Sequence, residues 1–186
     1  MRRIQTLPLL FFLSLLAAQS SPAQKKFNTT KGEICFVSNA ELEIIKAWSN
    51  EVKGIVVPAT NQFAFSVPIT SFQGFNGPLQ REHFLENYLE SDSYPNASFS
   101  GKIIEQIDFF SDGVYEVRAK GELDIHGQKQ SRIIKSKLTI KKGTLLIESQ
   151  FVVPLSDHNI SIPKIISQKI ATEIDVTFKA PMTLLP

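Results

Sequence analysis

The sequence predicts an all-β domain, an eight-stranded antiparallel up-and-down barrel that carries one amphipathic helix. Polar and apolar residues alternate along most of the chain after residue 30, as in strands that bury one face. Glycine interrupts these runs at 111–113, 126–128 and 141–143, where tight turns need a positive φ. Several runs are long enough to tilt and wrap, which favours a closed barrel over a two-layered sandwich.

The alternation assigns one face of each strand to the interior. Within 113–126, for example, Val117, Ala119 and Leu123 point one way and charged residues point the other. The small inward residues Ala119 and Gly121 are expected to leave room at the barrel centre. The strands expected from the pattern are 33–38, 42–48, 52–58, 62–70, 97–107, 113–126, 130–141, 144–153 and 169–180, in which the first two count as one bent strand.

One segment, "LQREHFLENYLE", breaks the β pattern because its apolar residues fall at helical spacing. Phe84 and Tyr88 are four residues apart, as are Leu85 and Leu89, so these four side chains form one stripe along a helix. Pro78 suits the first helical turn, where no backbone N–H is required. We expect this helix to cover the mouth of the barrel with its apolar stripe facing inward.

The N-terminus has the features of a secretory leader. Two arginines precede an apolar run, Leu7–Ala18, and small residues lead to a cleavage point after Ala23. The run is too short to span a bilayer comfortably, which argues against a membrane anchor. The expected organisation is a signal peptide over 1–23 and one barrel domain over 24–186, exported to the periplasm or secreted.

The charge and the cysteine content limit the partners of the mature chain. Without the two leader arginines the 20 basic residues fall to 18, which equals the 18 acidic residues. Nucleic acid is therefore not expected as a partner, because phosphate binding needs excess positive charge. Cys35 is the only cysteine, so no intramolecular disulfide can form.

The sequence shows no pattern of a metal centre or a catalytic site. None of His83, His126 and His158 is followed at short spacing by a second ligand of the kind seen in zinc motifs. No G-x-S-x-G is present, and Glu122 and Asp124 lie on the outward face of their strand. We therefore expect neither a metal, a cofactor nor catalytic residues, and no enzymatic activity.

Three stretches resemble the YceI-like family of lipocalin-like, polyisoprenoid-binding proteins. They are "GFNGPLQREHFLENYLESDSYPNASFSGKI" from Gly74 onward, "KGELDIHGQKQ" from Lys120, and "FVVPLSDHNISIPKI" from Phe151. The resemblance covers about residues 31–180 and implies a lipocalin-like barrel, exported in bacteria, that encloses an isoprenoid chain. The family's usual opening carries histidines that residues 32–54 lack, so the head-group contacts of those histidines are not expected.

The face assignments and the resemblance together predict a ligand-binding interior. The expected ligand is a polyisoprenoid, an isoprenoid quinone or a related lipid, and a homodimer is left open. The alternative is a barrel filled by its own side chains, as in an interaction or stress-response protein that works through its surface, because eight strands permit either. The residues expected to contact the ligand are Phe63, Phe65, Phe84, Leu85, Tyr88, Leu89, Phe99, Tyr115, Val117, Ala119, Leu123, Ile174, Val176 and Phe178.

Overall fold

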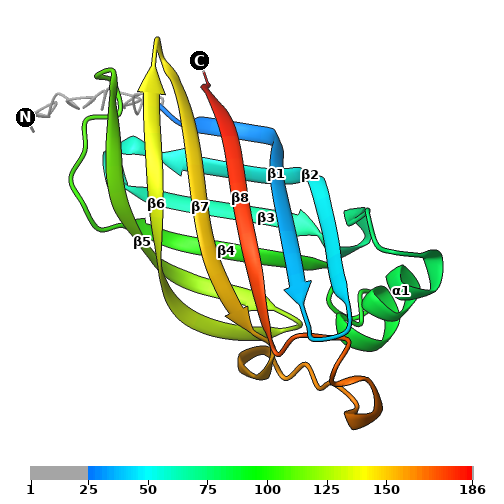
Figure 1. Ribbon diagram of the computed structural model, residues 1–186. Coiled ribbons are helices and arrows are strands. Elements are labelled where there is room, and N and C mark those ends of the chain that lie inside the picture. Colours follow the sequence, from blue (N-terminus) through cyan, green and yellow to red (C-terminus); the bar gives the residue numbers. More distant parts are fainter. Residues whose placement is uncertain (1–24, 186) are drawn as a thin grey trace, which may run out of the picture.

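The computed structural model describes residues 25–185, so the predicted signal peptide and its cleavage point after Ala23 lie outside the described residues. Within this range eight antiparallel strands follow one another around a closed barrel, and the last strand pairs with the first (Figure 1). This arrangement confirms the predicted all-β, lipocalin-like barrel. The strands are β1 (Phe27–Asn39), β2 (Ile44–Val57), β3 (Gln62–Pro68), β4 (Asn96–Ile103), β5 (Gly113–Ile125), β6 (Gln128–Lys141), β7 (Thr144–Pro154) and β8 (Glu173–Leu184).

The predicted bent strand made of 33–38 and 42–48 is wrong. The segment 33–38 belongs to β1, whereas 42–48 continues through 52–58 as the single strand β2. A tight turn separates the two strands, and in it the Ala40 N–H donates to the Glu43 carbonyl at 3.1 Å. The polar residues in the middle of β2 therefore belong to the strand and do not mark a connection.

A β-bulge explains why the alternation in the sequence predicts two strands where the structure has only β2. Gly32 pairs with Val52 and Ile34 pairs with Ser49, so two residues of β2 oppose one residue of β1. Ser49 and Val52 are both buried, and the extra residue shifts the inward positions from odd to even numbers. The Glu51 N–H donates to the Ser49 hydroxyl at 3.1 Å and satisfies one backbone donor at the bulge.

The predicted helix is present, but it changes pitch halfway. An α-helical part, α1 (Pro78–His83), runs into a π-helical turn (Phe84–Tyr88), and we call the two parts together the lid helix. In the π turn the Leu89 N–H donates to the Phe84 carbonyl, five residues earlier, at 3.0 Å. Because of this wider turn, Leu89 lies on the same helix face as Phe84, and Leu85 lies off that face.

No helix among residues 25–185 has the length and apolar character needed to cross a bilayer.

Arg81 is one of the residues that anchor the lid helix to the barrel. Arg81 donates from Nε to the Phe72 carbonyl at 2.9 Å and from Nη2 to the Thr70 carbonyl at 2.6 Å. Both carbonyls lie in the segment that follows β3, and charge-assisted bonds of this kind are stronger than neutral ones. The guanidinium therefore holds the lid helix at one end of the barrel, opposite the end where the two termini of the described chain lie (Figure 1).

The two ends of the barrel interior are filled differently. At the end near the termini, Phe27, Leu145 and Met182 are completely buried in one apolar cluster, and Phe109 from the β4–β5 connection packs against Phe27 with ring centroids 6.2 Å apart. None of these four side chains lines the cavity that occupies the rest of the interior. We call this the closed end, and the remaining space lies toward the lid helix.

The predicted room at Gly121 is not present. Gly121 of β5 pairs directly with Gly101 of β4, and a Cβ on Gly121 would clash with the Ser100 carbonyl oxygen. A Cβ on Gly101 would in turn clash with the Lys120 carbonyl oxygen. The two glycines therefore allow the backbones of β4 and β5 to approach closely, as happens at barrel corners.

We expect Gly121→Ala to lower the free energy of unfolding by roughly 1–3 kcal/mol, because the added methyl group overpacks against a backbone that cannot move aside. Thermal and chemical denaturation measure this loss. Gly77→Ala is the matched control, since nothing lies within 4 Å of a Cβ at that position. Equal stability of the two variants would contradict the close approach of β4 and β5.

Candidate ligand-binding cavity

A cavity of about 620 Å³ occupies the part of the barrel interior beside the lid helix. Its volume falls within the range of small-molecule sites, roughly 300–1,000 Å³. The cavity reaches the surface between the lid helix, the β1–β2 turn and the long β7–β8 loop (155–172), which contribute Gln80, Glu43 and Lys169 to its lining. The interior is therefore packed at the closed end and open at the other, so neither of the two predicted alternatives describes all of it.

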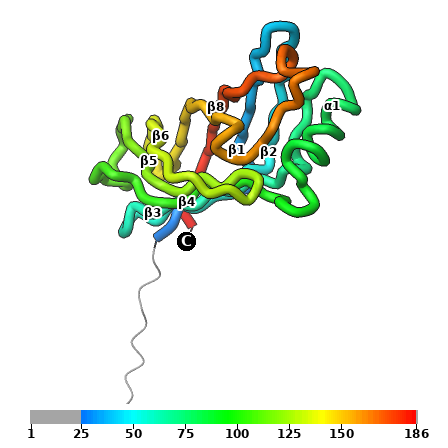
Figure 2. Tube along the Cα trace, turned by 90° about the horizontal axis from the view of Figure 1, so that it is seen from below, coloured from blue at the N-terminus to red at the C-terminus, as the bar shows by residue number. Residues whose placement is uncertain are grey.

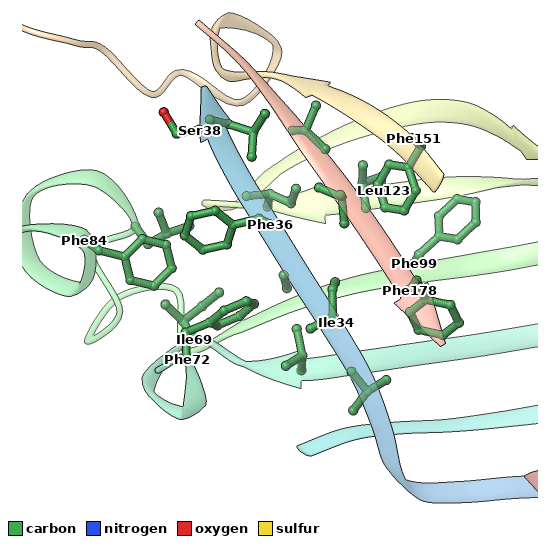
Figure 3. A pocket seen from close by; sticks show the side chains of 18 of the residues that line it. Ile34, Phe36, Ser38, Ile69, Phe72, Phe84, Phe99, Leu123, Phe151 and Phe178 are labelled. Atoms are coloured by element: carbon green, nitrogen blue, oxygen red, sulfur yellow. The ribbon is translucent and has the colours of Figure 1, made fainter. Parts of the chain in front are cut away.

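Four phenylalanines line the cavity near its mouth. Phe84 of the lid helix stacks on Phe36 of β1 with ring centroids 5.4 Å apart. Phe75 lies 5.0 Å and Phe72 lies 5.6 Å from Phe84, again between ring centroids. Figure 3 shows Phe36, Phe72 and Phe84 projecting toward one another from different elements. This aromatic cluster joins the lid helix to the barrel wall while presenting only apolar surface to the cavity.

A second aromatic group lies deeper in the barrel. Phe63 and Phe99 have ring centroids 5.0 Å apart, and Phe65 meets Phe178 edge to face at 5.1 Å. These rings come from β3, β4 and β8 and pack against the cluster of the closed end. The deep aromatic group therefore marks the change from cavity to packed core.

The structure brings most of the predicted contact residues together. Leu85 and Tyr115 do not line the cavity: Leu85 packs against Ile69 and Ile160 beneath the lid helix, and Tyr115 packs against the closed-end cluster. The π turn explains the first difference, and the position of Tyr115 at the closed-end side of β5 explains the second. The predicted residues that do line the cavity are Phe63, Phe65, Phe84, Tyr88, Leu89, Phe99, Val117, Ala119, Leu123, Ile174, Val176 and Phe178.

Sequence reasoning missed two groups of lining residues. The inward positions of β6 and β7, such as Ile134 and Phe151, follow the same alternation as the other strands and could have been included. Phe72 and Phe75 lie in an irregular segment without any period. The backbone pairing of Gln73 with Trp48 fixes that segment against β2, and no sequence pattern signals this pairing.

A pair of serine hydroxyl groups lies within the mainly apolar wall of the cavity. Ser136 of β6 and Ser149 of β7 are register partners, and their hydroxyl oxygens are 2.7 Å apart. Both residues line the cavity, and Ser136 is buried. Each hydroxyl has one proton and their mutual hydrogen bond uses only one of the two. The pair can therefore donate one hydrogen bond to an oxygen atom inside the cavity.

Two histidines support the loops around the mouth. The Nδ1 atom of His126 lies 3.1 Å from the His158 carbonyl oxygen, and its Nε2 atom lies 3.2 Å from Glu90 Oε1 at the end of the lid helix. His158 is completely buried, and its Nδ1 atom lies 3.0 Å from the Gln128 carbonyl oxygen. Since carbonyl oxygens only accept, both Nδ1 atoms carry protons. These contacts connect the lid helix, the β5–β6 turn and the β7–β8 loop.

The histidines do not converge on one point. His83 lines the mouth on the exposed side of the lid helix, whereas His126 lies in the β5–β6 turn and His158 in the β7–β8 loop. Among residues 25–185 no three side chains of His, Cys, Asp or Glu form a group that could hold a metal ion. The expectation that the protein contains no metal stays a prediction.

At the mouth, burial raises the pKa of the Tyr88 phenol, which keeps this hydroxyl neutral.

The structure defines a barrel with a lid helix and an apolar cavity that opens at one end. Sequence comparison gives its family. A family model, the YceI-like domain, matches residues 16–182. The chain therefore belongs to the YceI-like family, which confirms the resemblance seen in the sequence. No curated protein matches the chain.

Solved structures share the fold at low sequence identity. A polyisoprenoid binding domain from Saccharophagus degradans aligns with a TM-score of 0.72 at 11% identity, over 87% of this chain and 99% of that one. Burkholderia cenocepacia BcnA aligns at 0.66 and 16% identity, over 82% and 96%. A Campylobacter jejuni YCEI protein aligns at 0.59 and 14% identity, over 77% and 86%. At these identities the alignments establish the fold.

We expect His158→Ala to lower the free energy of unfolding by roughly 2–4 kcal/mol, because it leaves the Gln128 carbonyl unpaired and opens a void. Chemical denaturation of the purified variant measures the loss. His83→Ala, on the exposed side of the lid helix, should change stability by less than about 0.5 kcal/mol. A His158 variant as stable as the His83 variant would show that the buried imidazole does not brace the loops.

Proposed function

We propose that the barrel binds one long apolar ligand of the isoprenoid class, a polyisoprenoid, an isoprenoid quinone or a related lipid, and sequesters or transports it. The observation that carries this proposal is the apolar cavity of about 620 Å³ beneath the lid helix. The polyisoprenoid binding domain of Saccharophagus degradans, which shares the fold, supports the ligand class. The role is binding without a catalytic step, because the cavity wall is formed mainly by hydrocarbon side chains.

Apolar contact alone supplies enough free energy for such a ligand. Each methylene group removed from water contributes about 0.8 kcal/mol. Ten buried methylene groups therefore give about 8 kcal/mol, which corresponds to a Kd near 1 μM before the costs of ordering are subtracted. The aromatic clusters at both ends of the cavity provide rigid surfaces for an unsaturated, methyl-branched chain.

The serine pair favours a ligand that carries an oxygen atom. Ser136 and Ser149 offer one hydroxyl proton to the cavity, and a carbonyl, ether or hydroxyl oxygen of the ligand can accept it. A quinone or a polyprenol satisfies this donor, whereas a pure hydrocarbon leaves it unpaired. This reasoning selects among isoprenoids without requiring a charged head group inside the barrel.

We also propose that the protein works outside the cytoplasm, in the periplasm or in a secreted form. The support for export is the leader predicted from Leu7–Ala18 and the small residues before Ala23. We expect the exported protein to begin at Gln24 after cleavage. N-terminal sequencing of the protein recovered from the periplasm or the medium tests this, and a chain that still begins at Met1 would contradict it.

The ligand itself is tested with two matched substitutions inside the barrel. Both alanines belong to the closed-end cluster, but Ala119 also lines the cavity, whereas Ala180 is completely buried and does not line it. We expect Ala119→Leu to fill cavity space, so that the delipidated protein keeps its stability but retains much less lipid after expression. Ala180→Leu should cost roughly 1–3 kcal/mol of stability because it overpacks a filled core.

Mass spectrometry of an organic extract of each purified protein identifies and quantifies the bound lipid, and thermal denaturation after delipidation reports stability. Wild-type protein is expected to release an isoprenoid lipid. An equal loss of stability in both variants would mean that no cavity exists at Ala119. Wild-type protein that yields no lipid, and takes up none when mixed with geranylgeraniol, would refute the proposed function.

A further inference from the structure

Four large apolar side chains are exposed around the cavity mouth. They are Leu42 in the β1–β2 turn, Ile44 at the start of β2, Leu79 on the lid helix and Ile165 in the β7–β8 loop, with exposed fractions of 64%, 61%, 60% and 93%. Single exposed apolar residues are ordinary, but a cluster beside a binding site indicates an interaction surface. We call these four residues the mouth rim.

Hydrogen bonds show that the segments of the mouth rim are neighbours. The Leu42 N–H donates to the Gln168 carbonyl at 2.9 Å, which joins the β1–β2 turn to the β7–β8 loop. On the other side, Asn76 just before the lid helix donates from Nδ2 to the Ile44 carbonyl at 3.0 Å. Gln80 of the lid helix donates to Glu43 Oε1, also at 3.0 Å. The β1–β2 turn thus contacts both of the other segments, and Figure 2 shows all three on the same side of the molecule.

The mouth rim is continuous with the cavity. Leu79 belongs both to the rim and to the cavity lining, and Ile166 and Ile170, which also line the cavity, lie on the same loop as Ile165. An apolar chain leaving the cavity therefore passes from buried apolar surface directly onto exposed apolar surface.

From this arrangement we infer that the mouth rim docks onto the surface of a lipid bilayer, so that the ligand passes between membrane and cavity without crossing water. The inference rests on the proposed function, because a long isoprenoid is stored in a bilayer and is nearly insoluble in water. The apolar tips enter the boundary between head groups and acyl chains, as the apolar faces of interfacial proteins do.

The charges around the rim fit this position. Lys164 and Lys169 flank Ile165 on the β7–β8 loop, both are exposed, and neither forms an ion pair within residues 25–185. Ammonium groups at this level can contact lipid phosphates. Acidic residues, Glu41 and Glu82 among them, are neighbours of the mouth rim in the sequence. The apolar side chains of the rim, and not net charge, therefore provide most of the attraction to the bilayer.

A second copy of the chain or another protein fits the rim less well. A partner seated on three projecting segments around an opening would cover the mouth and block the ligand's path. A bilayer, in contrast, supplies the ligand at the point of contact.

The test measures cosedimentation of the purified protein with phosphatidylcholine vesicles and with vesicles that also contain phosphatidylglycerol. We expect the wild type to bind both, more strongly with phosphatidylglycerol. The double variant Leu42→Asp/Ile165→Asp should bind at least about tenfold more weakly, because two apolar tips are lost and two charges must approach the bilayer. The control Val114→Asp/Ile133→Asp removes two residues of 61% and 58% exposure from the outer faces of β5 and β6 and should bind like the wild type.

Two further measurements separate docking from ligand binding and from dimerisation. Geranylgeraniol added in detergent solution should bind to the double variant as to the wild type, whereas transfer of this alcohol between vesicles should slow at least about tenfold. A wild type that binds no vesicles, or a double variant that docks and transfers normally, overturns the inference while leaving the proposed function intact. Sedimentation velocity showing that the rim joins two copies in solution, with no effect of the double variant on vesicle binding, also overturns it.

Discussion

Closure of the hydrogen-bonded sheet is the constraint on which the rest of this structure depends. Once β8 pairs with β1, strand number and tilt set the girth of the barrel, and the wall cannot contract around smaller side chains. Whether the interior is solid or hollow then depends only on the size of the inward residues. Phe27, Leu145 and Met182 fill one end, whereas the residues above them leave about 620 Å³ unfilled.

A hollow end needs a cover that does not itself fill the space, and the lid helix meets this need from outside the sheet. Phe84 reaches inward to Phe36 and Phe72, while hydrogen bonds from Arg81 to the Phe72 carbonyl and from Gln80 to Glu43 anchor the helix. Polar contacts thus fix the position of the lid helix, and apolar contacts form the ceiling of the cavity. The two kinds of interaction act on different faces of one short segment.

The sequence was most informative where one rule governs a long segment. Strict alternation identified the inward faces of β3, β5 and β8, and most of the lining residues follow from it. It failed where the backbone departs from regular geometry. The bulge beside Ser49 made β2 read as two strands, the π turn moved Leu85 off the cavity face, and the close approach of β4 and β5 removed the room expected at Gly121. Each departure depends on a partner strand or turn that is distant in sequence or invisible to periodicity.

The closed end has a kinetic consequence for any molecule held in the barrel. Because the packed cluster around Phe27 fills the far end, a molecule held in the cavity leaves through the mouth by which it entered. Two occupants cannot pass each other there, so an incoming molecule waits until the resident one has left. The exchange rate should then become independent of the concentration of the incoming molecule and equal the dissociation rate of the resident one, and a chain longer than the cavity must leave one end protruding beneath the lid helix.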